Sequence, residues 1–305
     1  MLSATINRYA YGSLRQRKDR RVTIESVDFG TTTELDLDEG ADLTGQLDLV
    51  KAAIRRFGTP DAGGYDLVLR SNAPPGSGLG SSSTMMVALT GLLADHHGST
   101  LDDYETAQLA HAIERVDLGI SGGMQDPYAA TFGGFNFIEF GDEVIVNPLR
   151  VRDEVINELE LSLMLCFTGT TRASAKVIDD QTRRVSEGSF DALAGLRAQK
   201  ELAVTMKAAL LRGELREFGE LLGEAWKQKK RMSPLISNER IEDLYDIATK
   251  NGAVGGKVTG AGGGGFILFY CDFTRKHRAI EALEKAGASI VEFSFESRGL
   301  RTWRA

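Results

Sequence analysis

The sequence has little of what marks a secreted, metal-centred or nucleic-acid-binding protein. Only two of its 305 residues are cysteines, and its four histidines lack the spacing of a metal site. Cys166 and Cys271 each lie inside an apolar run, which is typical of buried thiols in a reducing compartment. The net charge of −7 argues against a general nucleic-acid-binding protein, because such proteins are normally basic. The first residues show no apolar stretch typical of a signal peptide. We therefore expect a cytoplasmic protein with no nucleic-acid partner.

Long apolar runs are lacking as well. Residues 71–94 are uncharged, and a stretch of this length would be long enough to span a membrane. Their first half is proline, glycine and serine, and only residues 85–94 are mainly apolar, so we expect no membrane partner. Apolar residues make up 42% and charged residues 26% of the chain, which is ordinary for a folded protein. The length predicts two domains or one large domain.

The sequence predicts both strands and helices along the chain. Near residue 153 the pattern changes, and long helices follow. The first part predicts strands at residues 22–26 and 65–70, with helices over residues 47–57, 85–97 and 101–118. The second part predicts a buried strand at 161–167, long helices at 190–212, 214–230 and 241–250, and strands at 266–270 and 290–295 with a helix between them. Its strand–helix–strand order is the ferredoxin-like pattern. These patterns predict an α+β protein with domains over residues 1–152 and 153–305.

A glycine- and serine-rich segment at residues 74–83 follows a predicted strand and opens a predicted helix. Its glycines permit a tight turn, and the free amides and dipole at a helix start suit an anion, most simply a phosphate. No Gly-Lys-Ser/Thr follows, which excludes a Walker A loop, and the third glycine of a dinucleotide fingerprint is missing. The alternative is a flexible turn with serine caps.

A second glycine-rich segment, residues 255–265, runs into a predicted strand. Seven of its eleven residues are glycine, although a structural turn needs only one or two. We therefore expect this loop to close on a ligand or on the first glycine loop. The alternative is a floppy linker.

Two carboxylates stand out between these segments. Asp126 lies in the glycine-rich turn 119–128 and could accept or orient the proton of a substrate hydroxyl; alternatively, its Asp-Pro sequence caps a helix. Glu114 shares a helical face with Ala107 and Ala110, and a carboxylate among small apolar side chains needs a cation partner. That cation is either Mg²⁺ or, in a salt bridge, an arginine such as Arg115.

Two further polar segments have less specific patterns. Residues 168–174 follow the buried strand, and their hydroxyls with Arg172 suit an anionic or polyhydroxylated ligand or, alternatively, a capped helix start. Residues 227–231 are basic at a predicted helix end, where cations favour the helix dipole. A contact to a substrate phosphate is the second interpretation of these cations.

Taken together, the segments resemble the GHMP kinase superfamily, which includes galactokinase, homoserine kinase and mevalonate kinase. Pro74 or Pro75 through Ser82 matches the family's second motif, Pro-x-x-x-Gly-Leu-Gly-Ser-Ser, and residues 257–265 match its glycine-rich third motif. Within the superfamily, the chain is similar to the bacterial heptose 7-phosphate kinases. The passages that carry this similarity are residues 4–11, 122–130, 168–172, 226–230 and 236–238.

The resemblance implies a fold and a reaction. The fold is a ribosomal-protein-S5-like amino-terminal domain and a ferredoxin-like carboxy-terminal domain, with ATP between them. The reaction is transfer of the γ-phosphate of ATP to the anomeric hydroxyl of D-glycero-D-manno-heptose 7-phosphate. The alternatives are a kinase for another sugar, fucose- or galactose-like, and a catalytically impaired ATP-binding protein.

The resemblance also assigns roles to residues. Asp126 matches the catalytic carboxylate, and Glu114 with Ser82 or Ser81 matches the Mg²⁺ ligands. Arg172, Gly262 and Gly263 are the expected substrate contacts. The ATP phosphate loop comprises Pro75, Gly76, Ser77, Gly78, Leu79, Gly80, Ser81, Ser82 and Ser83.

The family's first motif, of the form Pro-x-Arg…Gly-Gly-Gly-Thr-Asp, has no counterpart in this chain, whose first residues match the strand that follows that motif. We expect that Met1 is not the natural start and that upstream codons encode a strand and a Gly-Gly-Gly-Thr-Asp turn. The 305-residue form would then keep its ATP loop, bind sugar poorly and tend to associate through an unpaired sheet edge.

Overall fold

A computed structural model describes residues 1–39, 42–43, 45–58, 63–171 and 174–305 of the chain. Its contacts divide the chain into two compact units. We call Arg8–Pro74, Gly80–Gly133 and Arg298–Ala305 the amino-terminal unit, and Met1–Asn7, Pro75–Leu79 and Gly134–Ser297 the carboxy-terminal unit. Each unit thus includes a short segment from the far end of the chain. The sequence predicted two continuous domains that meet between residues 152 and 153. The two units are not continuous in sequence, so that boundary stays a prediction.

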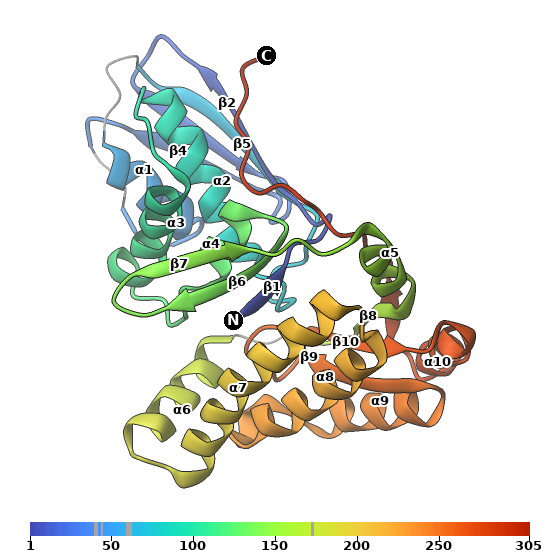
Figure 1. Ribbon diagram of the computed structural model, residues 1–305. Helices are drawn as coiled ribbons and strands as arrows, with labels where there is room; N and C mark the ends of the chain where they lie inside the picture. Colours follow the sequence, from blue (N-terminus) through green and yellow to red (C-terminus); the bar gives the residue numbers. More distant parts are fainter. Residues whose placement is uncertain (40–41, 44, 59–62, 172–173) are drawn as a thin grey trace. The chain divides into compact units, whose positions relative to one another are not determined.

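The amino-terminal unit contains a four-stranded sheet (Figure 1). Its strand order is β2 (Ala10–Gln16), β5 (Tyr65–Ser71), β3 (Arg21–Ser26) and β4 (Thr31–Asp36). β5 is antiparallel to β2 and parallel to β3, while β3 and β4 pair antiparallel. Tyr65, Leu67 and Leu69 alternate along β5 and are buried, so this face of the strand belongs to the core. The strands expected at residues 22–26 and 65–70 are confirmed.

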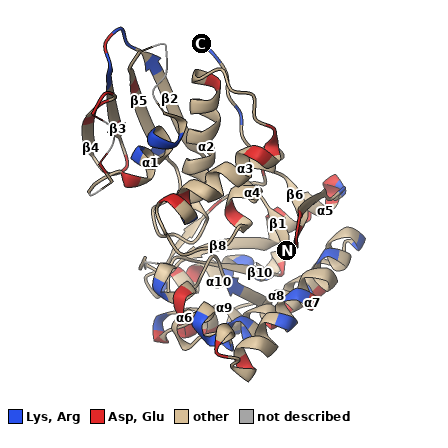
Figure 2. Ribbon diagram, turned by 90° about the vertical axis from the view of Figure 1, so that its left-hand side faces the viewer, with Lys and Arg blue, Asp and Glu red and all other residues tan. Residues whose placement is uncertain are grey.

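Helix α2 (Ser81–His96) is the central helix of this unit. It contacts β2 and the helices α1 (Asp48–Phe57), α3 (Asp103–Ala112) and α4 (Gln125–Phe132). Residues 81–94 carry no charge, as the tan colour of α2 in Figure 2 shows, because neighbours surround most of the helix. The sequence predicted one helix over residues 101–118, which is wrong in part: α3 ends at Ala112 and continues as a π-helical turn, η1 (Ile113–Asp117).

The last residues of the chain pack on α2 and α4. The backbone N–H of Leu300 donates to the carbonyl oxygen of Thr131 at 3.0 Å. A Cβ atom built on Gly91 would lie 2.6 Å from the Leu300 side chain, which therefore rests directly on α2. Arg304 adds an ion pair with Asp95 at 3.2 Å. These contacts explain why the carboxyl-terminal segment belongs to the amino-terminal unit.

The carboxy-terminal unit contains an antiparallel sheet with strand order β11 (Ser289–Val291), β8 (Leu163–Phe167), β10 (Phe266–Cys271) and β9 (Ala253–Val258). Along the chain, helices separate β8 from β9, and α10 (Phe273–Lys285) separates β10 from β11. This order and pairing are those of a ferredoxin-like fold. The α+β prediction is therefore confirmed, with the last strand shorter than the predicted 290–295.

Further helices and a small sheet complete this unit. The helices predicted at 190–212, 214–230 and 241–250 are confirmed as α7 (Phe190–Arg212), α8 (Leu215–Lys230) and α9 (Glu239–Lys250). The remaining elements are α5 (Asp153–Ser162), α6 (Ser174–Ser186), the short 3-10 helix η2 (Pro234–Ile236), and the sheet of β1 (Leu2–Ala4), β6 (Phe135–Phe140) and β7 (Val144–Pro148). Among the described residues, no helix is both long and apolar enough to cross a membrane.

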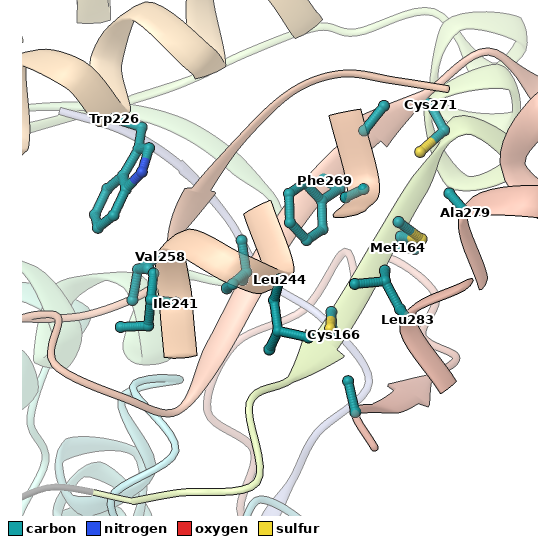
Figure 3. Close-up of a cluster of buried hydrophobic side chains, with 14 of the residues drawn as sticks. Met164, Cys166, Trp226, Ile241, Leu244, Val258, Phe269, Cys271, Ala279 and Leu283 are labelled. Atoms are coloured by element: carbon teal, nitrogen blue, oxygen red, sulfur yellow. The ribbon is translucent and has the colours of Figure 1, made fainter. Parts of the chain in front are cut away.

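The core of the carboxy-terminal unit encloses both cysteines. Figure 3 shows Cys166 and Cys271 among buried side chains of α9, α10, β8 and β10, including Leu244, Phe269 and Leu283. Burial raises the pKa of each thiol to about 12. The prediction of buried, unlinked thiols is confirmed.

Helix α8 approaches the edge strand β9 at positions without side chains. A Cβ atom built on Gly255 would lie 2.2 Å from the carbonyl oxygen of Gly219, and one built on Gly223 would lie 3.3 Å from the Cα of Gly255. One on Gly219 would lie 2.4 Å from the Tyr270 ring. Backbone-to-backbone contact of this kind leaves no space for a methyl group, because the helix would have to move away from the sheet.

We predict that Gly255→Ala lowers the free energy of unfolding by about 1–3 kcal/mol, the usual cost of overpacking a rigid contact. Urea denaturation followed by circular dichroism measures this loss. Gly141→Ala is the control, because a Cβ there would meet its nearest neighbour at 3.6 Å, an ordinary contact distance. Equal stability of the two variants would contradict the packing account.

Candidate active site

The first glycine-rich segment connects β5 to α2, as predicted. Gly76, Gly78 and Gly80 have φ angles of 70°, 77° and 73°. Residues with a side chain rarely adopt such values. Glycine therefore occurs at every second position because the backbone is left-handed there. α2 begins at Ser81, so the first N–H groups of this helix lie where the loop ends. The hydroxyl of Ser77, a fully buried residue, has no hydrogen-bond partner within the described residues.

Glu114 is fully buried and is held by two serine hydroxyls from the first turn of α2. Ser82 Oγ donates to Oε1 and Ser83 Oγ donates to Oε2, both at 2.6 Å. A nitrogen of the Arg115 guanidinium lies 3.6 Å from Oε2. A buried carboxylate is costly unless charge-assisted hydrogen bonds and a cation compensate for the lost water. The two interpretations of Glu114, a site carboxylate and a partner of Arg115, are therefore compatible.

The donor set around Glu114 fits a magnesium ion. Carboxylate and hydroxyl oxygens are hard ligands, and Mg²⁺ commonly uses one or two protein carboxylates together with phosphate oxygens and water. Ser82 is exposed, whereas Ser83 is only 2% exposed. Ser82 and Glu114 are thus the pair suited to the ion, and Ser83 fixes the carboxylate from the buried side. Its contact with Glu114 was missed from the sequence, since serines at a helix start are commonly explained as caps.

Asp126 is the second residue of α4 and lies beside the start of α2. A Cβ atom built on Gly80 would lie 3.3 Å from both Cβ and Cγ of Asp126. The alternative that Asp126 caps its helix is wrong, because α4 begins at Gln125 and its N-cap is Met124. The first turn of α2 thus contacts both predicted carboxylates, Glu114 through Ser82 and Ser83, and Asp126 through Gly80.

The second glycine-rich segment closes on part of the first glycine loop, which confirms one of the two alternatives expected from the sequence. Within the carboxy-terminal unit, the N–H of Phe266 donates to the carbonyl oxygen of Ser77 at 3.1 Å. A Cβ atom built on Gly265 would lie 2.2 Å from the same oxygen, and one built on Gly260 would lie 2.8 Å from the Cα of Gly78. Glycine at these positions is therefore a requirement of contact between two backbones.

Neighbouring segments hold this second loop along its length, so it is not a floppy linker. The segments 168–174, 227–231 and 236–238, which the sequence singled out, all contribute. Their contacts are Gly265 N–H to Thr170 O at 2.8 Å, Thr168 Oγ1 to Gly265 O at 2.9 Å, Gly263 N–H to Ile236 O at 2.8 Å, Asn238 Nδ2 to Gly263 O at 3.1 Å, and Lys229 Nζ to Gly260 O.

The predicted substrate contacts are Gly262, Gly263 and Arg172. Both backbone groups of Gly263 are engaged with Ile236 and Asn238, and a Cβ atom on Gly262 would lie 2.7 Å from Ile236 O. Contacts of these two glycines with a substrate stay a prediction. Arg172 lies outside the described residues.

His111, near Glu114, and Lys257, in the second glycine-rich segment, have lowered pKa values. His111 lies one turn before Arg115; burial lowers its pKa, the Arg115 charge lowers it further, and Glu114 opposes both. Burial lowers the pKa of Lys257, whose Nζ donates to Gln199 Oε1 at 3.3 Å. Lys257 is therefore turned toward α7, although it is the first residue of the stretch 257–265 that matches the family's third motif.

Two family models match the chain. Residues 48–134 match the GHMP kinases N terminal domain, and residues 206–289 match the GHMP kinases C terminal model. The first range includes the α2 turn with Glu114 and Asp126, and the second includes the loop that closes on Ser77 and Gly78.

Similar proteins extend this match to the whole chain. The D-glycero-alpha-D-manno-heptose 7-phosphate kinase of Campylobacter jejuni is 40% identical over 309 aligned residues, which cover all of this chain and 91% of that protein. A solved structure of a D-glycero-D-manno-heptose 1-phosphate kinase from Bacteroides thetaiotaomicron is 34% identical, with a TM-score of 0.78 over all of this chain and 90% of that one. The galactokinase of Lactococcus lactis, 22% identical, shares the fold with a TM-score of 0.78 over 98% of this chain and 88% of that one.

We predict that Ser83→Ala destabilises the protein by about 1.5–3 kcal/mol, because a buried carboxylate loses a charge-assisted hydrogen bond. Ser82→Ala should cost less, since water can replace an exposed hydroxyl at Glu114. Urea denaturation without nucleotide or metal compares the two variants. If Ser82→Ala proved the more damaging, Ser83 would not be the group that fixes the carboxylate.

Proposed function

Since the chain belongs to the GHMP kinase family, as a sugar kinase with ATP as its phosphate donor, we propose that its acceptor is D-glycero-D-manno-heptose 7-phosphate. The γ-phosphate goes to the anomeric hydroxyl. The observation that carries this choice is the 40% identity to a heptose 7-phosphate kinase over the entire chain. The similarity to the solved heptose 1-phosphate kinase of Bacteroides thetaiotaomicron supports the same class of sugar. ATP is available in the cytosol, where we place the reaction.

The phosphate loop and Glu114 serve the nucleotide in this proposal. Backbone amides of residues 75–83 and the positive end of the α2 dipole bind the phosphates of ATP. Glu114 and Ser82 would hold Mg²⁺, which when bound supplies positive charge to the phosphate oxygens. Ser83 and Arg115 keep Glu114 oriented, so that the carboxylate needs no rearrangement when the nucleotide arrives. Ser81 remains the alternative serine ligand.

Asp126 serves the acceptor hydroxyl. The oxygen–phosphorus bond to the sugar forms as the bond to the leaving ADP breaks, and the hydroxyl proton passes to the Asp126 carboxylate. Phosphoryl transfer depends largely on positioning and on charge stabilisation, so orientation of the hydroxyl by Asp126 contributes beside proton transfer. Arg172, Gly262 and Gly263 remain the proposed contacts of the sugar phosphate.

A sugar panel tests the acceptor. D-glycero-D-manno-heptose 7-phosphate, L-fucose and galactose are each incubated with ATP and Mg²⁺, and ADP release is measured with the product identified by mass spectrometry. Fucose belongs in the panel because a bifunctional fucokinase of Arabidopsis thaliana is 30% identical over 72% of this chain, which spans 21% of that protein. We expect turnover on the heptose phosphate. Turnover on a free hexose alone would assign a different sugar, and no turnover on any sugar would favour an ATP-binding protein.

We predict that Asp126→Asn lowers kcat by about 10²–10⁴-fold, the usual effect of losing a general base, with little change in ATP affinity. Steady-state kinetics with calorimetric ATP binding measures both. Asp103→Asn is the matched control, because it also removes a carboxylate from the first turn of a helix in the same unit. Near-normal turnover of Asp126→Asn would remove Asp126 from the chemistry.

A further inference from the structure

Arg115 is mostly buried, with its side chain 14% exposed, and its guanidinium contacts two different parts of the amino-terminal unit. One nitrogen lies 3.6 Å from Oε2 of Glu114. The other terminal nitrogen donates to the carbonyl oxygens of Ile120 and Ser121, at 3.3 and 3.4 Å. These carbonyls belong to the loop between the π-helical turn η1 and α4. A single side chain therefore joins Glu114 to that loop.

The same guanidinium lies flat against Gly122. A Cβ atom built on Gly122 would lie 2.2 Å from the Cζ of Arg115, and 2.4 and 2.6 Å from its two terminal nitrogens. The φ angle of Gly122 is outside the left-handed region, so the backbone itself would accept alanine. The three atoms nearest to such a Cβ all belong to the guanidinium. At the adjacent Gly123, a Cβ atom would meet nothing within 4 Å.

The loop between η1 and α4, which Arg115 contacts, leads directly to Asp126. The N–H of Ile120 donates to the carbonyl oxygen of Glu114 at 3.1 Å, which ties the loop's start to η1. Four residues beyond Gly122, Asp126 occupies the second position of α4. A planar guanidinium can serve a carboxylate and two carbonyls at once, whereas a lysine ammonium on a flexible stem cannot reproduce that geometry.

We propose that Arg115 is a positioning residue for the kinase reaction: it fixes the Glu114 carboxylate relative to the loop that carries Asp126. The inference rests on the proposed function, in which Glu114 serves the metal and Asp126 the acceptor hydroxyl. Arg115 touches neither substrate. Its contribution is the relative placement of two groups that must act on the same phosphoryl transfer, where a displacement of about 1 Å can cost about 10²-fold in rate.

The first test replaces the guanidinium. We expect Arg115→Lys to lower kcat by about 10–10²-fold, with the KM for ATP little changed and the Mg²⁺ concentration for half-maximal activity raised. Hydrogen exchange of residues 119–126 should become faster. Arg56→Lys is the control, because Arg56 is also an arginine that pairs with a carboxylate of the same π-helical turn, Asp117, at 3.5 Å. An Arg115→Lys enzyme with the kinetics and exchange of the control would overturn the proposal.

The second test uses the adjacent glycines. Gly122→Ala should displace the guanidinium and reproduce the loss in kcat, whereas Gly123→Ala should leave kcat unchanged. In an Arg115→Ala background the three nearest obstacles are gone, so Gly122→Ala should add no further loss. Equal effects of the two glycine substitutions on kcat, or additive effects of Gly122→Ala and Arg115→Ala, would contradict the proposed role of Arg115.

The choice of acceptor and the role of Arg115 can each be disproved without the other. If the wild-type enzyme does not phosphorylate the heptose, the acceptor assignment fails, and the kinetic tests of Arg115 run on whichever sugar is turned over. Hydrogen exchange of residues 119–126 needs no sugar. Unchanged exchange in both Arg115→Lys and Gly122→Ala would overturn the inference even if the acceptor were right.

Discussion

The buried carboxylate of Glu114 is the group on which the arrangement of the amino-terminal unit depends. It has no exposed surface, so its charge must be balanced by groups that are held in place, and Ser82, Ser83 and Arg115 supply that balance. The serines fix the first turn of α2 against η1, and the arginine fixes the loop that leads to Asp126. A local electrostatic requirement thus arranges the start of α2 and both carboxylates.

The second constraint on the structure is the absence of side chains where two loop backbones touch. Gly260 and Gly265 let one loop backbone lie against that of Ser77 and Gly78, and the loop's own peptide groups are held by hydrogen bonds from several segments. The entropy cost of ordering a glycine-rich loop is thereby met in the folded protein, before any ligand arrives. A preformed loop of this kind suits a protein that binds the phosphates of a nucleotide.

The two glycine loops could be predicted from the sequence because glycine spacing directly reflects backbone conformation. Glu114 could be predicted because a charge among alanines on one helical face needs a partner. The π-helical turn could not, since one extra residue in a helix leaves no periodic signal, and the contact of Arg115 with Gly122 arises only when the loop folds back on the helix. Asp-Pro was a misleading signal for a cap at Asp126, because α4 begins at Gln125. Helix α5 was not predicted, and the start of α6 was offered only as an alternative for residues 168–174, since each helix has few apolar residues that are buried on one face.

The most direct test of this account is calorimetric titration of ADP into the wild-type protein and Glu114→Gln, each with and without Mg²⁺. The amide keeps the shape of the side chain and removes the charge that a hard cation requires. We predict that both proteins bind ADP alike without metal, and that only the wild type gains affinity when Mg²⁺ is added. An equal gain in Glu114→Gln would contradict the assignment of Glu114 as the metal-binding carboxylate.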